Sequence, residues 1–293
     1  MNLSRSQLLW LFGGLTILTL FAALMLLPFY WMTLSSVKSL AEINRLPPTW
    51  WPEEVNWSNY LEAWTKPEST FGRYMLNSFV VAGLGTFLQL LISVPAAYAL
   101  ANFQFRGRNL LFLLIIATML IPYEMLLIPN FVTIRHWPLA GGNDLLGRGG
   151  QGFYDSHLGI MLPFLADAFT IFLLRQAFLS IPKEFWEAAQ MDGLRRFAYL
   201  NRVALPLVAP VLLTAGLLSF VGKWNGAIWP LLITSSESMR VLQVGMILFT
   251  FEEGSNYQLL MAASTFTVLP IVLLYLFTQR YFQEGVISSG LKG

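Results

Sequence analysis

The stretch 158–221 decides the fold of this chain. It reads LGIMLPFLADAFTIFLLRQAFL at 158–179, SIPKEFWEAAQMDGLRRFAYLNR at 180–202 and VALPLVAPVLLTAGLLSFV at 203–221. The first and last parts are apolar runs of 22 and 19 residues, and the middle part is polar. A helix needs about 20 mostly apolar residues to cross a bilayer. The stretch therefore predicts two membrane spans joined by a polar loop.

The whole chain of 293 residues has the composition of a membrane protein. Hydrophobic residues make up 56% and charged residues 12%, and the mean hydropathy is +0.59. Soluble domains have about 45–50% apolar and about 25% charged residues, so the soluble and disordered classes are excluded. The net charge of +2 is too small to indicate nucleic acid. The absence of cysteine excludes disulfides and cysteine-ligated zinc.

Further apolar runs predict an all-α integral membrane fold with six transmembrane helices. The expected spans are about 8–34, 76–101, 110–134, 158–179, 203–221 and 259–278. The first run is too long for a signal peptide and no small-residue cleavage site follows it, so we expect it to be retained. Two shorter runs, 226–234 and 241–251, cannot span a bilayer, and we expect them to be core-facing or re-entrant.

Basic residues predict the orientation of these spans. If the N-terminus is inside, the inside segments are 1–7, 103–109, 175–203 and 280–293, and the outside segments are 36–73, 135–157 and 222–258. The inside segments hold ten basic and four acidic residues in 57, and the outside segments hold eight and ten in 98. The positive-inside rule therefore predicts a multi-pass protein with both termini cytoplasmic. In one outside segment, the glycine-rich part 141–152 is expected to be a flexible surface loop.

The polar loop has the local pattern of a helix, a break and a second helix. Pro182 suits a helix start, early carboxylates favour the helix dipole, and Gly193 suits a helix stop. The residues expected on one helix face are Phe185, Ala188, Ala189 and Asp192. Because two of them are alanines, another surface can come close. This pattern predicts a short helix that inserts into a groove of a partner protein.

The same loop resembles the EAA loop of binding-protein-dependent ABC importer permeases. The matching residues are Glu187, Ala188, Ala189, Asp192, Gly193, Leu205 and Pro206, with Val203 where the family usually has isoleucine. Asn77-Ser78-Phe79, the run 95–101 and Trp224-Asn225 are similar to the carbohydrate-uptake branch of this family. The end of the chain resembles that of the six-helix permease subunit of maltose transporters.

The resemblance implies a division of labour. Residues 1–293 would form one ABC transporter transmembrane domain with a coupling loop at 181–206, in a bacterial or archaeal inner membrane. Its partners would be a second homologous permease, two cytoplasmic ATPase subunits and an extracytoplasmic solute-binding protein, with no nucleic acid. This chain would bind no cofactor, and ATP and Mg would be used by the partner ATPase. In agreement, none of its lysines completes a P-loop motif. The cargo would be a sugar, a polyol or a sugar phosphate.

Polar residues inside the apolar runs are candidates for the solute path. Glu124 and Asp167 are the acids placed at membrane depth, where an ionisable group is costly. Asn77, Gln89 and Asn225 are weaker candidates of the same kind. Such groups also hold helices together through hydrogen bonds, and this remains the alternative.

Two other function classes compete with a permease. An intramembrane enzyme would have to use Glu124 and Asp167 as its catalytic pair, since both histidines lie in predicted loops. A self-sufficient secondary carrier would normally be longer or show two related halves. Neither class accounts for the loop 181–206.

Overall fold

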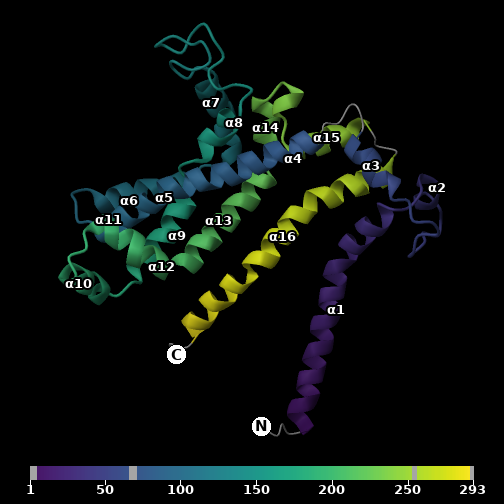
Figure 1. Cartoon of the computed structure of the whole chain (residues 1–293), viewed down its shortest axis with the longest axis horizontal. Coiled ribbons are helices and arrows are strands. Elements are labelled where there is room, and N and C mark those ends of the chain that lie inside the picture. The colour runs from purple at the N-terminus through teal and green to yellow at the C-terminus, as the bar shows by residue number, and fades with distance from the viewer. Residues whose placement is uncertain (1–4, 66–70, 253–255, 291–293) are drawn as a thin grey trace. The chain divides into compact units, whose positions relative to one another are not determined.

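The computed structural model describes residues 5–65, 71–252 and 256–290, and the regular elements in these ranges are all helical (Figure 1). The chain divides into two compact units, Met1–Phe71 with Met246–Leu269 and Gly72–Gly245 with Pro270–Gly293. The all-α expectation is confirmed. The prediction of one membrane domain over 1–293 stays a prediction.

The first unit is built around aromatic side chains. It contains α1 (Arg5–Ser35), α2 (Leu40–Ile43), α3 (Ser58–Thr65), most of α15 (Leu242–Glu252) and the first part of α16 (Tyr257–Gly290). Phe71 is fully buried, and its ring centroid lies 6.2 Å from that of Trp64 and 6.0 Å from that of Phe266. These rings tie α3 to α16.

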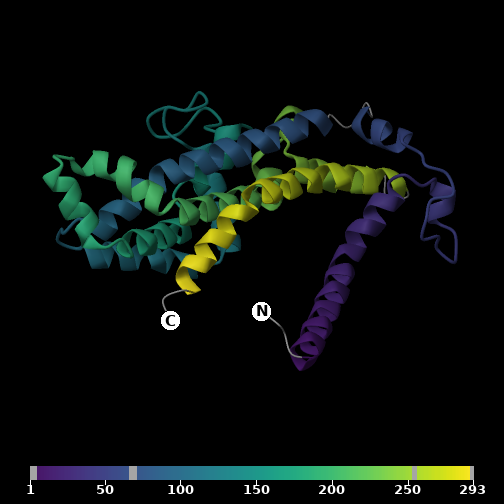
Figure 2. The same ribbon diagram turned by 60° about the horizontal axis from the view of Figure 1, so that its bottom comes forward.

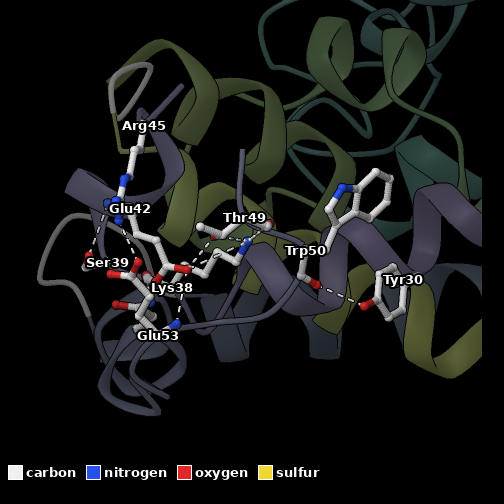
Figure 3. A network of polar contacts seen from close by, with 9 residues as sticks. Tyr30, Lys38, Ser39, Glu42, Arg45, Thr49, Trp50 and Glu53 are labelled. Carbon is white, nitrogen blue, oxygen red and sulfur yellow. Dashed lines mark hydrogen bonds and ion pairs between the residues drawn. The ribbon is translucent and has the colours of Figure 1, made fainter. Parts of the chain in front are cut away.

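A buried lysine fixes the segment that follows α1 (Figure 3). Lys38 is 2% exposed, and its ammonium donates to the backbone oxygen of Thr49 at 2.5 Å and to its Oγ1 at 3.0 Å. The carboxylate of Glu42 lies 3.9 Å from Lys38 Nζ and accepts from Thr49 Oγ1 at 2.6 Å. A buried charge is tolerated where it is paired and hydrogen-bonded in this way. The network therefore fixes the conformation of the segment 38–49.

The second unit holds the start of α15 and the last part of α16, together with the remaining helices. The remaining helices are α4 (Phe71–Phe79), α5 (Gly85–Asn102), α6 (Arg108–Ala117), α7 (Tyr123–Arg135), α8 (His157–Met161), α9 (Ala168–Leu179), α10 (Lys183–Met191), α11 (Arg196–Tyr199), α12 (Leu205–Leu207), α13 (Ala209–Trp224) and α14 (Ile228–Ile233). A π-helical turn at Val80–Leu84 joins α4 to α5, and another at Leu200–Ala204 joins α11 to α12.

Helix α5 is the central element of this unit. Both α9 and α13 pack along it. Small residues allow this close packing, because Ala97 is fully buried beside Leu174 and Phe178 of α9. Figures 1 and 2 show α10 and α11 beyond one end of α5, and α8 and α14 toward its other end. Helix α5 therefore extends from the region of α10 and α11 to the region of α8 and α14.

By length and composition, the described residues contain three to six candidate membrane spans. The helices Trp10–Ser35, Phe71–Asn102 and Tyr257–Gln279 are each long and apolar enough to cross. Three further helix pairs qualify only if each bent pair counts as one span. They are Arg108–Leu120 with Tyr123–Arg135, bent by 103°, His157–Phe164 with Ala168–Leu179, bent by 50°, and Arg196–Leu207 with Ala209–Trp224, bent by 80°. Prolines such as Pro122 and Pro210 lie at two of these breaks, where they remove a helix donor.

The glycine-rich loop is closely hydrogen-bonded, and its expected flexibility stays a prediction. Residues 136–153 form a set of hydrogen-bonded turns, in which Asn143 Nδ2 donates to two backbone carbonyls and its Oδ1 accepts from Gly150 N at 2.8 Å. A Cβ at Gly147 would lie 2.0 Å from the backbone oxygen of His136. The glycines thus permit close packing of backbone on backbone, which no side chain would allow.

Candidate functional site

A cavity of about 700 Å³ lies inside the second unit. Its walls come from α5, α9, α13, α14 and the turn between α8 and α9. Aromatic rings of Tyr123, Phe164 and Trp229 line it, and the indole N–H of Trp229 is held by the backbone oxygens of Gly159 and Ile160, both at 3.2 Å. Mostly apolar walls with a few placed polar groups are the usual form of a small-molecule site.

A hydrogen-bonded cluster forms one wall of the cavity. Gln89 of α5, 3% exposed, accepts through Oε1 from Ser219 Oγ at 2.7 Å and from the ammonium of Lys223. Gln89 Nε2 donates to Thr170 Oγ1 of α9 at 2.8 Å. Lys223 Nζ also donates to Ser219 Oγ at 2.8 Å, one helical turn earlier in α13. The cluster therefore joins three helices at the cavity surface.

Asp167 caps a helix at the same cavity. It precedes α9, and its Oδ2 accepts from Thr170 N at 2.8 Å as the N-cap of that helix. A carboxylate in this position satisfies a free backbone donor and favours the helix dipole. The break before α9 thus explains why an acid occurs inside an apolar run.

The predicted solute-path residues divide into two groups. Gln89, Asp167 and Asn225 line the cavity. Asn77 instead donates to the backbone oxygens of Ser238 and Arg240, at 2.9 and 2.8 Å, and is not among the lining residues. Glu124 lies in the first turn of α7 with an exposed side chain, also outside the lining.

Sequence reasoning missed Lys223, Ser219 and Thr170. Lys223 was counted in an outside segment because the apolar run ends at 221, whereas α13 continues to Trp224. The signal that could have found it is the spacing of Ser219 and Lys223. Residues four apart on a helix share a face, so these two polar groups had to point the same way.

Most of the predicted coupling residues lie in α10 or directly after it. Ala189 is buried in a core with Tyr98 and Tyr199, whereas Ala188 is exposed, so the two alanines do not share one free face as expected. Glu187 and Asp192 are also exposed, and Asp192 is the C-cap of α10. The carboxyl-terminal part of the motif is more distant, since Leu205 and Pro206 form α12.

Gly193 follows the last turn of α10 and stops the helix, as expected for a glycine at this position. Its φ is +74°, the left-handed region that favours glycine, and its amide donates to the Gln190 oxygen at 3.0 Å. The amide of Leu194 donates to the Ala189 oxygen at 2.9 Å. These two bonds satisfy carbonyls at the end of the helix.

Aromatic contacts attach α10 to the rest of the unit. The Trp186 ring meets the Tyr199 ring edge-on, with centroids 5.0 Å apart. The guanidinium of Arg196 lies 5.3 Å from the Trp186 ring centroid and 4.8 Å from that of Phe103. At the exposed side of α10, Met191 is 85% exposed. The helix is therefore anchored on one side and open on the other.

Comparisons with known proteins agree with this architecture. The family model for "binding-protein-dependent transport system inner membrane component" matches residues 89–288. The chain is 31% identical to the arabinooligosaccharides transport system permease protein AraQ of Bacillus subtilis over 282 residues, which cover 94% of this chain and 95% of that protein. It is 33% identical to the sulfoquinovosyl glycerol transport system permease protein SmoH of Agrobacterium fabrum, covering 92% and 89%.

A solved structure shows the same fold. It is a chain of a bacterial ABC transporter involved in the import of the acidic polysaccharide alginate, with a TM-score of 0.80 and 26% identity, covering 96% of this chain and 99% of that one. The resemblance drawn from the loop 181–206 is thus confirmed. The chain belongs to the binding-protein-dependent transport system inner membrane components, and it is a permease subunit of an ABC importer rather than an enzyme.

Proposed function

We propose that α10 is the contact through which a separate ATPase drives this permease. The anchored and open sides of α10 support this role, since Trp186 and Ala189 hold the helix to the permease while Glu187, Ala188 and Met191 remain exposed. An exposed face with a small residue at its centre lets a partner surface approach closely.

Helix α5 supplies a physical route from α10 to the cavity. Tyr98, near its end, packs with Tyr199 and Ala189, while Gln89 of the same helix belongs to the cavity wall. Nine residues of α-helix span about 13.5 Å at 1.5 Å per residue. A movement of α10 is therefore transmitted to the cavity by a rigid body. This is the observation that carries the proposal, and the resulting mechanism is alternating access.

The proposed assembly follows the family. The chain pairs with a second homologous permease, two cytoplasmic ATPase subunits that use ATP and Mg, and an extracytoplasmic solute-binding protein. Each bent helix pair counts as one span, which gives six spans with α10 and both termini on the cytoplasmic side. An intramembrane enzyme and a self-sufficient carrier are not favoured, because the family works through separate subunits.

The proposed cargo is a carbohydrate. The named relatives carry arabinooligosaccharides and sulfoquinovosyl glycerol, and the solved relative takes part in alginate import. The cavity suits such a solute, because it combines aromatic rings with hydrogen-bonding side chains.

The test of coupling uses the exposed Ala188 of α10. Ala188→Trp places a bulky ring on the exposed face, so the permease still folds, but uptake and transport-linked ATP hydrolysis by the reconstituted importer fall at least tenfold. Gln190→Ala, at an equally exposed position of the same helix, serves as the control with wild-type uptake. Wild-type uptake by Ala188→Trp would show that this face does not carry the coupling.

A further inference from the structure

Lys223 places a positive charge at the wall of the cavity. Its ammonium donates to Gln89 Oε1 and to Ser219 Oγ, and both acceptors are neutral. Among the residues that the structure describes, no carboxylate lies within 4.0 Å of this ammonium. Lys223 thus differs from Lys38, the buried lysine of the first unit, whose ammonium has the carboxylate of Glu42 nearby.

Asp167 lines the same cavity without pairing with Lys223. Its carboxylate is held at the N-terminus of α9, where Oδ2 accepts from Thr170 N at 2.8 Å. The two charges are therefore kept apart by separate hydrogen bonds. Lys223 is therefore a partly buried cation whose direct hydrogen-bond acceptors are neutral, and the charge of Asp167 acts on it only from beyond ion-pair distance.

Gly85 of α5 leaves room for the aliphatic part of the Lys223 side chain. A Cβ added at Gly85 of α5 would lie 3.2 Å from Cδ and 3.2 Å from Cε of Lys223. Glycine at this position lets the long side chain run along α5 toward Gln89. The location of the ammonium thus depends on two helices, and Gly85 is a positioning residue for it.

We propose that Lys223 is the counter-ion for a negatively charged group of the solute, so that this cavity selects anionic carbohydrates. The group is a carboxylate or phosphate on a sugar or polyol, and the hydroxyls bond to the exposed amide of Asn225 in the cavity wall. Charge-assisted hydrogen bonds of this type are stronger than bonds between neutral groups. The inference rests on the proposal that the cavity belongs to the solute path.

The competing role of Lys223 is a cross-link between α5 and α13. A cross-link would stabilise the packing of these helices but would not distinguish a charged solute from its neutral counterpart. The ratio of two affinities therefore separates the roles, because a general loss of folding lowers both affinities together.

The experiment measures binding to the complete importer in lipid nanodiscs without ATP. The probes are digalacturonate with its neutral counterpart galactobiose, and glycerol 3-phosphate with glycerol, at matched ionic strength. We expect at least one anionic probe to bind tenfold or more tightly than its counterpart, and the successful pair identifies a carboxylate or a phosphate. The preference should decrease at high salt, since salt screens the attraction.

Three variants complete the test. Lys223→Gln should reduce the preference to below threefold, and Lys223→Arg should retain it. Gly85→Ala should weaken it by displacing the lysine stem, whereas Gly83→Ala, where a Cβ meets nothing within 4 Å, should not. The inference is overturned if no anionic probe binds more tightly than its counterpart, or if Lys223→Gln keeps the preference. Since no ATP is present, a failure of coupling through α10 cannot cause either result.

Discussion

Asp155 connects two segments that lie about 80 residues apart in the sequence. Its Oδ1 accepts from the amides of Ser235 and Ser236, at 2.9 and 3.1 Å. Partial burial raises the pKa of Asp155, but the hydrogen bonds from Ser236 and Ser235 outweigh this effect, so the pKa lies below its usual value. A carboxylate stabilised in this way favours the folded loops only while it is ionised.

This contact should make the two loops sensitive to acid. Because the folded pKa is lowered, the stabilisation is complete above the unfolded pKa of about 3.9 and is lost as the pH falls through the lower, folded value. The hydrogen-exchange protection factors of the Ser235 and Ser236 amides, which are corrected for the intrinsic pH dependence of exchange, should therefore decrease in that acidic range. In Asp155→Asn, which keeps an acceptor oxygen and tolerates the positive φ of 53°, this pH dependence should disappear. Equal pH dependence in both proteins would contradict the assignment.

Single residues show which parts of the cavity wall can be expected from the sequence. Gln89 and Asn225 could be selected because an amide at membrane depth must find a polar partner or water. Lys223 could not, because its role depends on the last turn of α13, and helix ends are poorly defined by hydropathy. The charge of Asp167 was noticed, but its use as a helix cap depends on a bend that composition does not reveal.

At the scale of elements, α10 depends on the sharp turn that follows it. Gly193 adopts a φ of +74°, and no atom lies within 4 Å of the position of its missing Cβ. A substitution there is therefore disfavoured by backbone conformation and not by crowding. For an L-residue the left-handed conformation costs about 1–2 kcal/mol.

Gly193→Leu should therefore loosen the end of α10 and reduce transport-linked ATP hydrolysis several-fold, with little change in the amount of inserted protein. Gly193→Asn is the matched variant, because asparagine tolerates the left-handed region, and it should retain most of the activity. ATPase assays on both reconstituted variants provide the measurement. If leucine and asparagine behave alike, the turn does not limit coupling.

The helices themselves were only partly predictable. Apolar length located each candidate span, and the α10 helix and its stop followed from Pro182, the early carboxylates and Gly193. The burial of Ala189 was not foreseen, because a helical face is chosen by tertiary contacts such as those with Tyr98 and Tyr199. The bends of 103° and 80° between the helices of two pairs were also missed, because hydropathy along the sequence does not report the direction of a helix axis.

At the scale of the whole molecule, the chain is well suited to a direct measurement of topology. It contains no cysteine, so each introduced thiol is the only one. Single cysteines at the exposed positions Glu54, Arg148 and Glu237 should react with an impermeant maleimide in intact cells. Cysteines at Arg106 and Arg195 should react only after the membrane is opened.

These outcomes follow from the excess of basic residues in the inside segments and from six spans. Arg148 and Arg195 lie on either side of a pair bent by 50°, so their labelling decides whether that pair crosses the membrane once. The same label on both would reduce the number of spans.

The packed turns at 136–153 restrict substitution at several of the glycines in this segment. Alanine at Gly147 or Gly152 would drive a methyl group to within 2.0 or 2.2 Å of a backbone oxygen. Leu145 and Leu146, at 75% and 73% exposure, have no such restriction. In a saturation library of this segment selected for folded protein, these glycines should therefore be retained while Leu145 and Leu146 vary freely. An epitope tag is best inserted in place of these two leucines.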